Sequence, residues 1–125
     1  MIDTPSMIVL VEDDDGMRRA LQRLLHVAGF YTRAFDSAEA MLDIDGAANA
    51  CCLVLDVQLS GMSGPNAYGA LGVHRPPVVF ITSHDTVATH AAVHDVHGDA
   101  LLIKPFAGRD LLDAIRRVTG QEKRP

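Results

Sequence analysis

The chain has 125 residues, of which 48% are hydrophobic and 22% charged, as in soluble globular domains of this length. Its net charge of −5 argues against nucleic-acid binding through a basic face. No apolar run approaches the roughly 18 residues that span a membrane.

The N-terminal segment and the two cysteines indicate where in the cell the protein is expected. The N-terminal segment has no basic stretch ahead of its apolar run, so it does not resemble a signal peptide. Cys51 and Cys52 are adjacent and would point to opposite faces of a strand, which makes a mutual disulfide implausible. We interpret them as small strand residues rather than a redox pair, and expect a cytoplasmic protein.

The chain opens with a strand and a helix. Met7–Val11 is wholly apolar and predicts a buried strand. Apolar residues then recur with helical spacing over residues 17–28. Asp14 or Asp15 can cap the start of this helix, and Gly29 can end it.

The next strand and helix are weaker. Phe30–Ala34 includes the polar Thr32 and Arg33, a pattern typical of an edge strand. Asp36 or Ser37 can then cap a second helix.

The second half of the chain repeats this order. Three apolar strands are predicted: Cys52–Leu55, Val78–Ile81 and Ala100–Ile103. Because they and the first strand show no polar alternation, we expect all four to be buried on both faces. Helices are predicted after each: one from Pro65, interrupted by Gly69 and Gly72; one from Asp85 or Thr86 to about Val96; and one carrying Leu111, Leu112, Ile115 and Val118.

Strand followed by helix, five times over, predicts an α/β fold: a doubly wound five-stranded parallel sheet with five helices. We expect one domain, residues 1–125, with a core of about 6–119. Residues 120–125 would be a polar tail or the start of a linker.

Polar residues follow four of the predicted strands. They are Glu12 and Asp13, Asp56, Thr82, and Lys104. Ligands of open α/β sheets bind at the carboxyl ends of the strands, so we expect these side chains to converge. Crowded carboxylates favour a hard dication such as Mg²⁺. A carboxylate can also accept a phosphoryl group, with a metal and a lysine neutralising the charge.

Each residue also has a purely structural explanation. Asp13 could belong to a helix cap, Asp56 to a turn, and Lys104 could be a solvated charge; the four strand ends together are harder to explain that way. A dinucleotide-binding fold is excluded because the first strand–helix turn is acidic rather than glycine-rich. His90, His94 and His97 share helical spacing, but a solvated helix face explains them better than a zinc site.

Four motifs carry a family resemblance: IVLVEDDDGMRRAL, VLDVQLSGMSG, VVFITS and LLIKPF. Over essentially its whole length the chain resembles the receiver domain of two-component response regulators. It looks most like receivers attached to helix-turn-helix transcription factors. The resemblance implies a flavodoxin-like fold with strand order 2-1-3-4-5.

The resemblance also implies roles for single residues. Asp56 would accept a phosphoryl group from a histidine kinase with Mg²⁺, and the domain would then switch conformation. Glu12 and Asp13 match the acidic pair, with Asp13 favoured as the direct metal ligand. The other implied roles are the backbone carbonyl of Gln58 as a further metal ligand, Thr82 as the switch hydroxyl, and Lys104 as the phosphate contact, with a cis Lys104–Pro105 bond.

The resemblance implies a signalling switch rather than an enzyme acting on other molecules. Its partners would be a sensor histidine kinase and a C-terminal DNA-binding output domain outside this chain. A homodimer through the fourth helix, fifth strand and fifth helix stays open. Two rival functions also stay open: a receiver-like interaction module that never uses phosphate, and a small Mg²⁺-dependent phosphohydrolase, which the motif Asp56-x-Gln58 disfavours.

The sequence departs from the family pattern at four places. Ser60 replaces a usual proline, from which we expect a looser loop after Asp56. The segment Gly64–Pro77 looks about two residues short. His97 replaces a usual glycine, which predicts a turn that is strained or re-registered. Leu101 replaces a usual aromatic residue, so we expect the conformational readout to differ.

Overall fold

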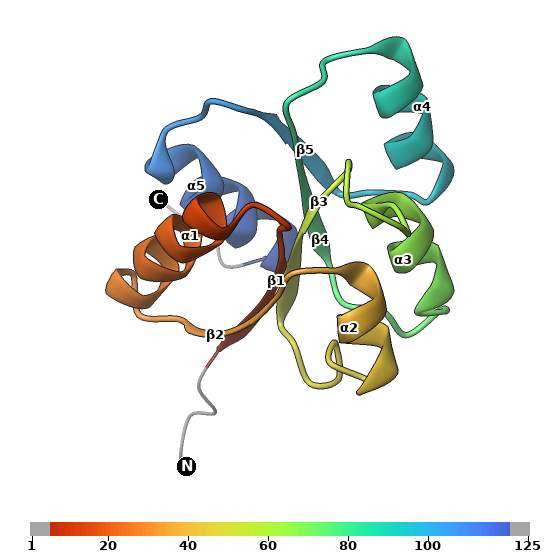
Figure 1. Cartoon of the computed structure of the whole chain (residues 1–125). Coiled ribbons are helices and arrows are strands. Elements are labelled where there is room, and N and C mark those ends of the chain that lie inside the picture. Colours follow the sequence, from red (N-terminus) through yellow and green to blue (C-terminus); the bar gives the residue numbers. More distant parts are fainter. Residues whose placement is uncertain (1–5, 121–125) are drawn as a thin grey trace.

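The computed structural model describes residues 6–120, in which strands and helices alternate along the chain (Figure 1). The strands are β1 (Met7–Val11), β2 (Tyr31–Phe35), β3 (Cys52–Asp56), β4 (Val78–Thr82) and β5 (Ala100–Ile103). The helices are α1 (Asp15–Val27), α2 (Ala38–Asp43), α3 (Gly64–Ala70), α4 (Val87–Asp95) and α5 (Gly108–Thr119).

All five strands are parallel, and their order is β2-β1-β3-β4-β5, which confirms the predicted fold and topology. From β1 the chain crosses outward to β2 and then returns to place β3 on the other side of β1. The loops that follow β1 and β3 therefore leave in opposite directions. In α/β proteins such a switch point, at the carboxyl ends of the two strands, is where ligands commonly bind.

Helices cover both faces of the sheet: α1 and α5 lie on one face, and α2, α3 and α4 lie on the other (Figure 1). Alternate residues of β1 point to the two layers. Ile8 and Leu10 pack with α1 and α5, whereas Val9 and Val11 pack with the opposite helices. Burial on both faces explains why β1, β3 and β4 lack polar alternation.

The two outer strands differ in how well they were predicted. β2 is an edge strand, as its alternating pattern indicated. The prediction that Ala100–Ile103 is buried on both faces was wrong, because all four residues of β5 are only partly buried. The physical reason is position: β5 forms the other edge of the sheet and has a strand neighbour on one side only.

Side-chain caps fix where most helices begin. The side chains of Asp14, Ser37, Ser63 and Thr86 each accept a hydrogen bond from a backbone N–H in the first turn of α1, α2, α3 and α4, respectively. For α1, α2 and α4 the sequence had left two neighbouring residues open as the start of the helix, and the structure selects one of each pair. Among residues 6–120, no helix is both long and apolar enough to cross a bilayer.

Two smaller expectations are also settled. His97 has a φ of 57°, so this residue takes the left-handed backbone conformation for which a glycine is usual. Cys52 is fully buried, and burial raises the pKa of its thiol to about 12. A thiol that is so hard to ionise is a poor redox group, which supports a structural role for this residue.

Candidate functional site

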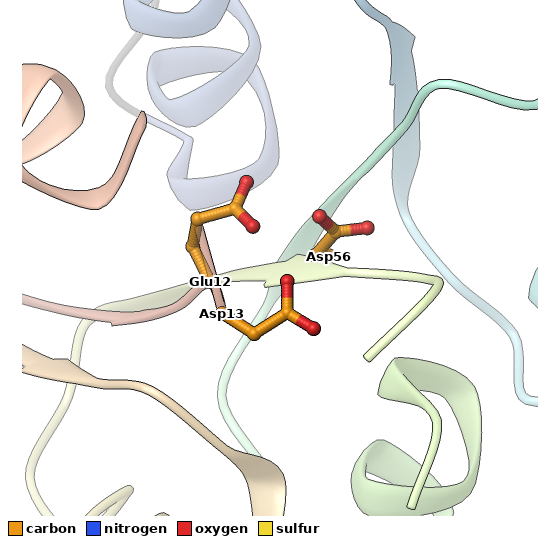
Figure 2. Close-up of side chains that lie close together, drawn as sticks. All are labelled: Glu12, Asp13 and Asp56. Atoms are coloured by element: carbon orange, nitrogen blue, oxygen red, sulfur yellow. The ribbon is translucent and has the colours of Figure 1, made fainter. Parts of the chain in front are cut away.

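Three carboxylates meet at the carboxyl edge of the sheet. Glu12 and Asp13 follow β1, and Asp56 is the last residue of β3. One oxygen from each lies within 4.8 Å of the others, and Figure 2 shows the three side chains gathered at the strand ends. Glu12 is 1% exposed and Asp56 is 4% exposed, whereas Asp13 is open to solvent. Two of the three charges are therefore held away from water.

Lys104, which directly follows β5, joins two of these carboxylates. Its Nζ lies 2.7 Å from Glu12 Oε1 and 2.7 Å from Asp56 Oδ2. The backbone aims it: the Lys104 N–H donates to the carbonyl of Thr82 at 2.7 Å, and the Lys104–Pro105 bond is cis, as predicted. The ammonium therefore bridges the carboxyl ends of β1 and β3.

The charge balance of the site is negative, since three carboxylates face one ammonium. Burial raises the pKa of Glu12, an effect that its bond to Lys104 only partly offsets. Burial lowers the pKa of Lys104, but hydrogen bonds to Asp56 and Glu12 outweigh this and leave it raised. An uncompensated cluster of hard oxygen ligands is what Mg²⁺ prefers. The residues present therefore fit a divalent cation.

The loop after Asp56 is tied to the same cluster. The Gln58 N–H donates to Asp56 Oδ1 at 3.0 Å. Ser60 was expected to loosen this loop, but its N–H and its hydroxyl both donate to Asp13 Oδ2 at 3.1 Å. Because proline offers neither donor, serine at this position adds two contacts to the acidic residue.

A close backbone approach fixes the loop further along. A Cβ on Gly64, at the start of α3, would lie 2.2 Å from the carbonyl oxygen of Asp56. Only glycine lets the chain return so near to the end of β3.

Thr82 and Gln58 meet through their side chains. Thr82 is fully buried; its hydroxyl donates to Gln58 Oε1 at 2.5 Å and accepts from the His84 N–H at 2.9 Å. The amide of Gln58 also donates to Thr89 Oγ1, in α4, at 3.2 Å. Sequence reasoning predicted a role only for the backbone carbonyl of Gln58 and missed Thr89. No short-range signal could have found this pair, which is 31 residues apart.

The predicted histidine helix face does not form a metal site. Within residues 6–120, the only group of three acidic, histidine or cysteine side chains close enough to share an ion is Glu12, Asp13 and Asp56. His90 instead pairs with the exposed Asp85 at 2.7 Å. His90 and His94 are exposed on α4, in agreement with a solvated face, but the prediction that His97 shares this helix was wrong because α4 ends at Asp95.

An apolar pocket of about 220 Å³ lies near Lys104. Met17, Leu21 and Leu24 of α1 line one part of it, and Pro105 and Phe106 line the other. The pocket therefore begins one residue beyond the lysine that binds Asp56.

Comparisons with known proteins agree with this geometry. The family model described as the response regulator receiver domain matches residues 8–116. Nodulation protein W of Bradyrhizobium diazoefficiens is 36% identical over 126 residues, covering 97% of this chain and 54% of that protein. Response regulator protein TmoT of Ectopseudomonas mendocina is 35% identical over 120 residues, covering 93% of this chain and 54% of that protein. The chain thus spans about half the length of these relatives.

A solved structure shares the fold. The CheY-like response regulator receiver domain protein from Methanospirillum hungatei JF-1 superposes with a TM-score of 0.87 at 19% identity, covering 94% of this chain and 96% of that one. Fold, strand-end chemistry and the family match over residues 8–116 all agree. The chain is therefore a receiver domain of the two-component response regulator family.

Proposed function

We propose that Asp56 is the phosphoacceptor of this receiver and that a sensor histidine kinase is the donor. The observation that carries the proposal is the 2.7 Å contact between Lys104 Nζ and Asp56 Oδ2 inside a cluster of carboxylates. A lysine in this place is ready to neutralise a phosphoryl oxygen. Asp56 is the acid that lies at the end of the central strand, next to both Asp13 and Lys104.

Glu12, Asp13, Asp56 and the backbone carbonyl of Gln58 are the residues that would hold Mg²⁺. Bound there, the ion would neutralise charge on the transferring phosphoryl group. Asp13 is the exposed member of the cluster, so it is open to an ion arriving from solvent. Lys104, with its raised pKa, remains protonated at neutral pH and supplies a second positive charge.

The reaction is a group transfer with no redox change. An Asp56 carboxylate oxygen attacks phosphorus as the P–N bond of the phosphohistidine breaks, and the bonding pair stays on the imidazole nitrogen. The domain takes part in its own phosphorylation and in the later hydrolysis, while its biological role is that of a switch. The Thr82 hydroxyl is the group that would donate to a phosphoryl oxygen.

The test uses the domain, Mg²⁺ and acetyl phosphate, with the modified residue mapped by mass spectrometry. We expect one phosphoryl group, on Asp56, removable by hydroxylamine. Asp56→Asn should abolish labelling, whereas Asp113→Asn, on the exposed side of α5, should label like the wild type. Wild-type labelling of Asp56→Asn would show that another residue is the acceptor.

The same experiment separates the rival functions. A receiver-like interaction module would take no phosphate, and a phosphohydrolase would release phosphate from small substrates with continued turnover. Two observations argue against these rivals. Lys104 is bound to Asp56, and the residue two positions after Asp56 is Gln58, an amide whose side chain is engaged by Thr82 and Thr89. A second catalytic carboxylate is therefore missing from that position.

Partners and boundaries complete the proposal. We infer a DNA-binding output domain, because the chain spans about half of its relatives and one of them is the transcriptional regulatory protein TdiR of Thauera aromatica. We infer a cytoplasmic, one-domain receiver with a core of residues 6–119. The apolar pocket lined in part by Pro105 offers the kinase a surface that begins one residue beyond Lys104, which binds Asp56. A phosphorylation-dependent homodimer through α4, β5 and α5 can be tested by sedimentation with and without beryllofluoride.

A further inference from the structure

We propose that the Gln58 side chain is a hydrogen-bond latch that holds the Thr82 hydroxyl in the unphosphorylated domain and links it to helix α4 through Thr89. The proposal rests on the proposed function, because it concerns the state before Asp56 is phosphorylated. Gln58 acts here as a positioning residue. It would set how easily the phosphorylated conformation forms.

The Thr82 hydroxyl can donate to one partner at a time. A threonine hydroxyl has one hydrogen to donate. In this structure that hydrogen goes to Gln58 Oε1, at 2.5 Å, in a place where Thr82 is fully buried. If Thr82 is to donate to a phosphoryl oxygen on Asp56, it must first release Gln58. The bond seen here and the bond to phosphate therefore exclude each other.

Gln58 is held in place through both its backbone and its side chain. Its backbone N–H donates to Asp56 Oδ1 at 3.0 Å, and its side-chain amide donates to Thr89 Oγ1 at 3.2 Å. Both ends of the residue are thus fixed, one to the acceptor carboxylate and one to α4. An amide that is anchored on both sides loses less entropy when it binds Thr82 than a mobile one would.

Thr89 connects Gln58 to the first turn of α4. Thr89 is 5% exposed, its backbone N–H donates to the Thr86 cap at 3.1 Å, and the Thr86 hydroxyl donates to Thr89 Oγ1 at 3.1 Å. Thr89 Oγ1 therefore joins Gln58 to the residue that starts the helix. When the Thr82 hydroxyl no longer donates to Gln58 Oε1, that amide oxygen is left without its hydrogen-bond partner. Because an unsatisfied amide oxygen is unfavourable, we expect the Gln58 side chain to reorient. That movement would change the first turn of α4.

This route does not use residue 101. Leu101 is partly buried and has no hydroxyl or aromatic ring, so it has no polar partner to exchange between two states. The polar chain from Thr82 through Gln58 to Thr89 leads to the same region of the molecule. A receiver with leucine at this position can thus still connect its acceptor site with α4.

The test measures binding of beryllofluoride, a phosphoryl mimic, by amide chemical shifts in saturating Mg²⁺. Gln58→Met and Thr89→Val remove the latch bonds with little change of shape. The lost hydrogen bond stabilises only the unphosphorylated conformation, and one hydrogen bond makes a modest net contribution to stability. Each variant should therefore bind beryllofluoride about 2- to 12-fold more tightly. The double variant should bind no more tightly than Gln58→Met alone, because the two side chains act in one chain of bonds.

Gln22→Met is the matched control. Gln22 donates to Thr32 Oγ1 at 3.5 Å, so its replacement also breaks a glutamine–threonine contact, but on α1 and β2. Its beryllofluoride affinity should equal that of the wild type. Hydrogen exchange at the Thr89 amide should respond to beryllofluoride in the wild type and in Gln22→Met, and much less in Gln58→Met.

The outcomes are separable. If the wild type binds no beryllofluoride in Mg²⁺, the proposed function is overturned and the latch with it. If the wild type binds but Thr89→Val and Gln58→Met bind as tightly as Gln22→Met, the latch alone is overturned. Additive gains in the double variant would also overturn it, since independent effects show that the two residues are not connected.

Discussion

Replacing Lys104 with methionine should reveal how much the acidic cluster depends on one ammonium. The change keeps most of the length of the side chain but removes the charge that lies 2.7 Å from both Glu12 and Asp56. The side chains of these acids are only 1% and 6% exposed, so little water can replace the lysine. Removing one partner from a buried ion pair typically costs about 3–5 kcal/mol.

The cost has a tighter upper limit, because Glu12 can take up a proton and so avoid carrying an unpaired buried charge. The ordinary pKa of this group is 4.5, so protonation at pH 7 spans 2.5 pH units and costs about 3.4 kcal/mol. At pH 5 the same step costs about 0.7 kcal/mol. We therefore expect Lys104→Met to lower the free energy of unfolding by about 2–3 kcal/mol at pH 7 and by less than about 1 kcal/mol at pH 5.

The sign follows from linkage. Burial raises the pKa of Glu12, and loss of Lys104 removes the contact that opposes this. A carboxyl group whose pKa is raised on folding destabilises the fold above that pKa, and the penalty disappears as the pH falls toward the unfolded value. In the wild type Lys104 stays protonated at both pH values, because its pKa is raised above 10.5. The raised pKa stabilises the folded domain up to about pH 10.5, and this contribution is lost only at higher pH.

The assay is urea unfolding in EDTA at both pH values, repeated with saturating Mg²⁺. Mg²⁺ should recover much of the loss at pH 7, since the ion would replace the missing positive charge. Arg116→Met is the control: its pair with Asp113 is 3.7 Å long and both side chains are well exposed, so its loss should matter little at either pH. An equal cost of Lys104→Met at pH 5 and pH 7 would refute the reasoning.

Three further predictions follow from the geometry. Asp13→Ala should weaken Mg²⁺ binding in a metal titration far more than Asp43→Ala, which removes an acid from α2, and equal affinities would contradict the site. Gly64→Ala should lower the urea midpoint sharply, because its Cβ would lie 2.2 Å from the Asp56 carbonyl oxygen. Gly69→Ala, whose Cβ would lie 3.6 Å from Val96 Cγ1, should instead stabilise α3 by about 0.5–1 kcal/mol. Similar changes in the two variants would argue against the close approach. Leu101→Tyr should enlarge the beryllofluoride-induced amide shifts in α4 and α5, and a full two-state shift in the wild type with no gain in the variant would show that leucine does not limit the readout.

The residues alone were sufficient for the succession of strands and helices and for the members of the cluster, whereas the strand order followed from the family resemblance. Apolar runs without alternation identified β1, β3 and β4, because a parallel strand covered by helices has no face in water. The positions of Glu12, Asp56 and Lys104 just at or after their strands were enough to bring them together, because all parallel strands end at the same edge. Both inferences depend only on short stretches of chain and on one rule of topology.

Only the tertiary structure decided how these groups are paired. Ser60 binds Asp13 across 47 residues of sequence, Lys104 binds Asp56 across 48, and the Gln58 amide is shared between Thr82 and Thr89. Each of these polar side chains could reach several partners. Which partner it takes is set by burial, by the direction of the backbone and by competition among nearby donors, and these exist only once distant segments have packed together.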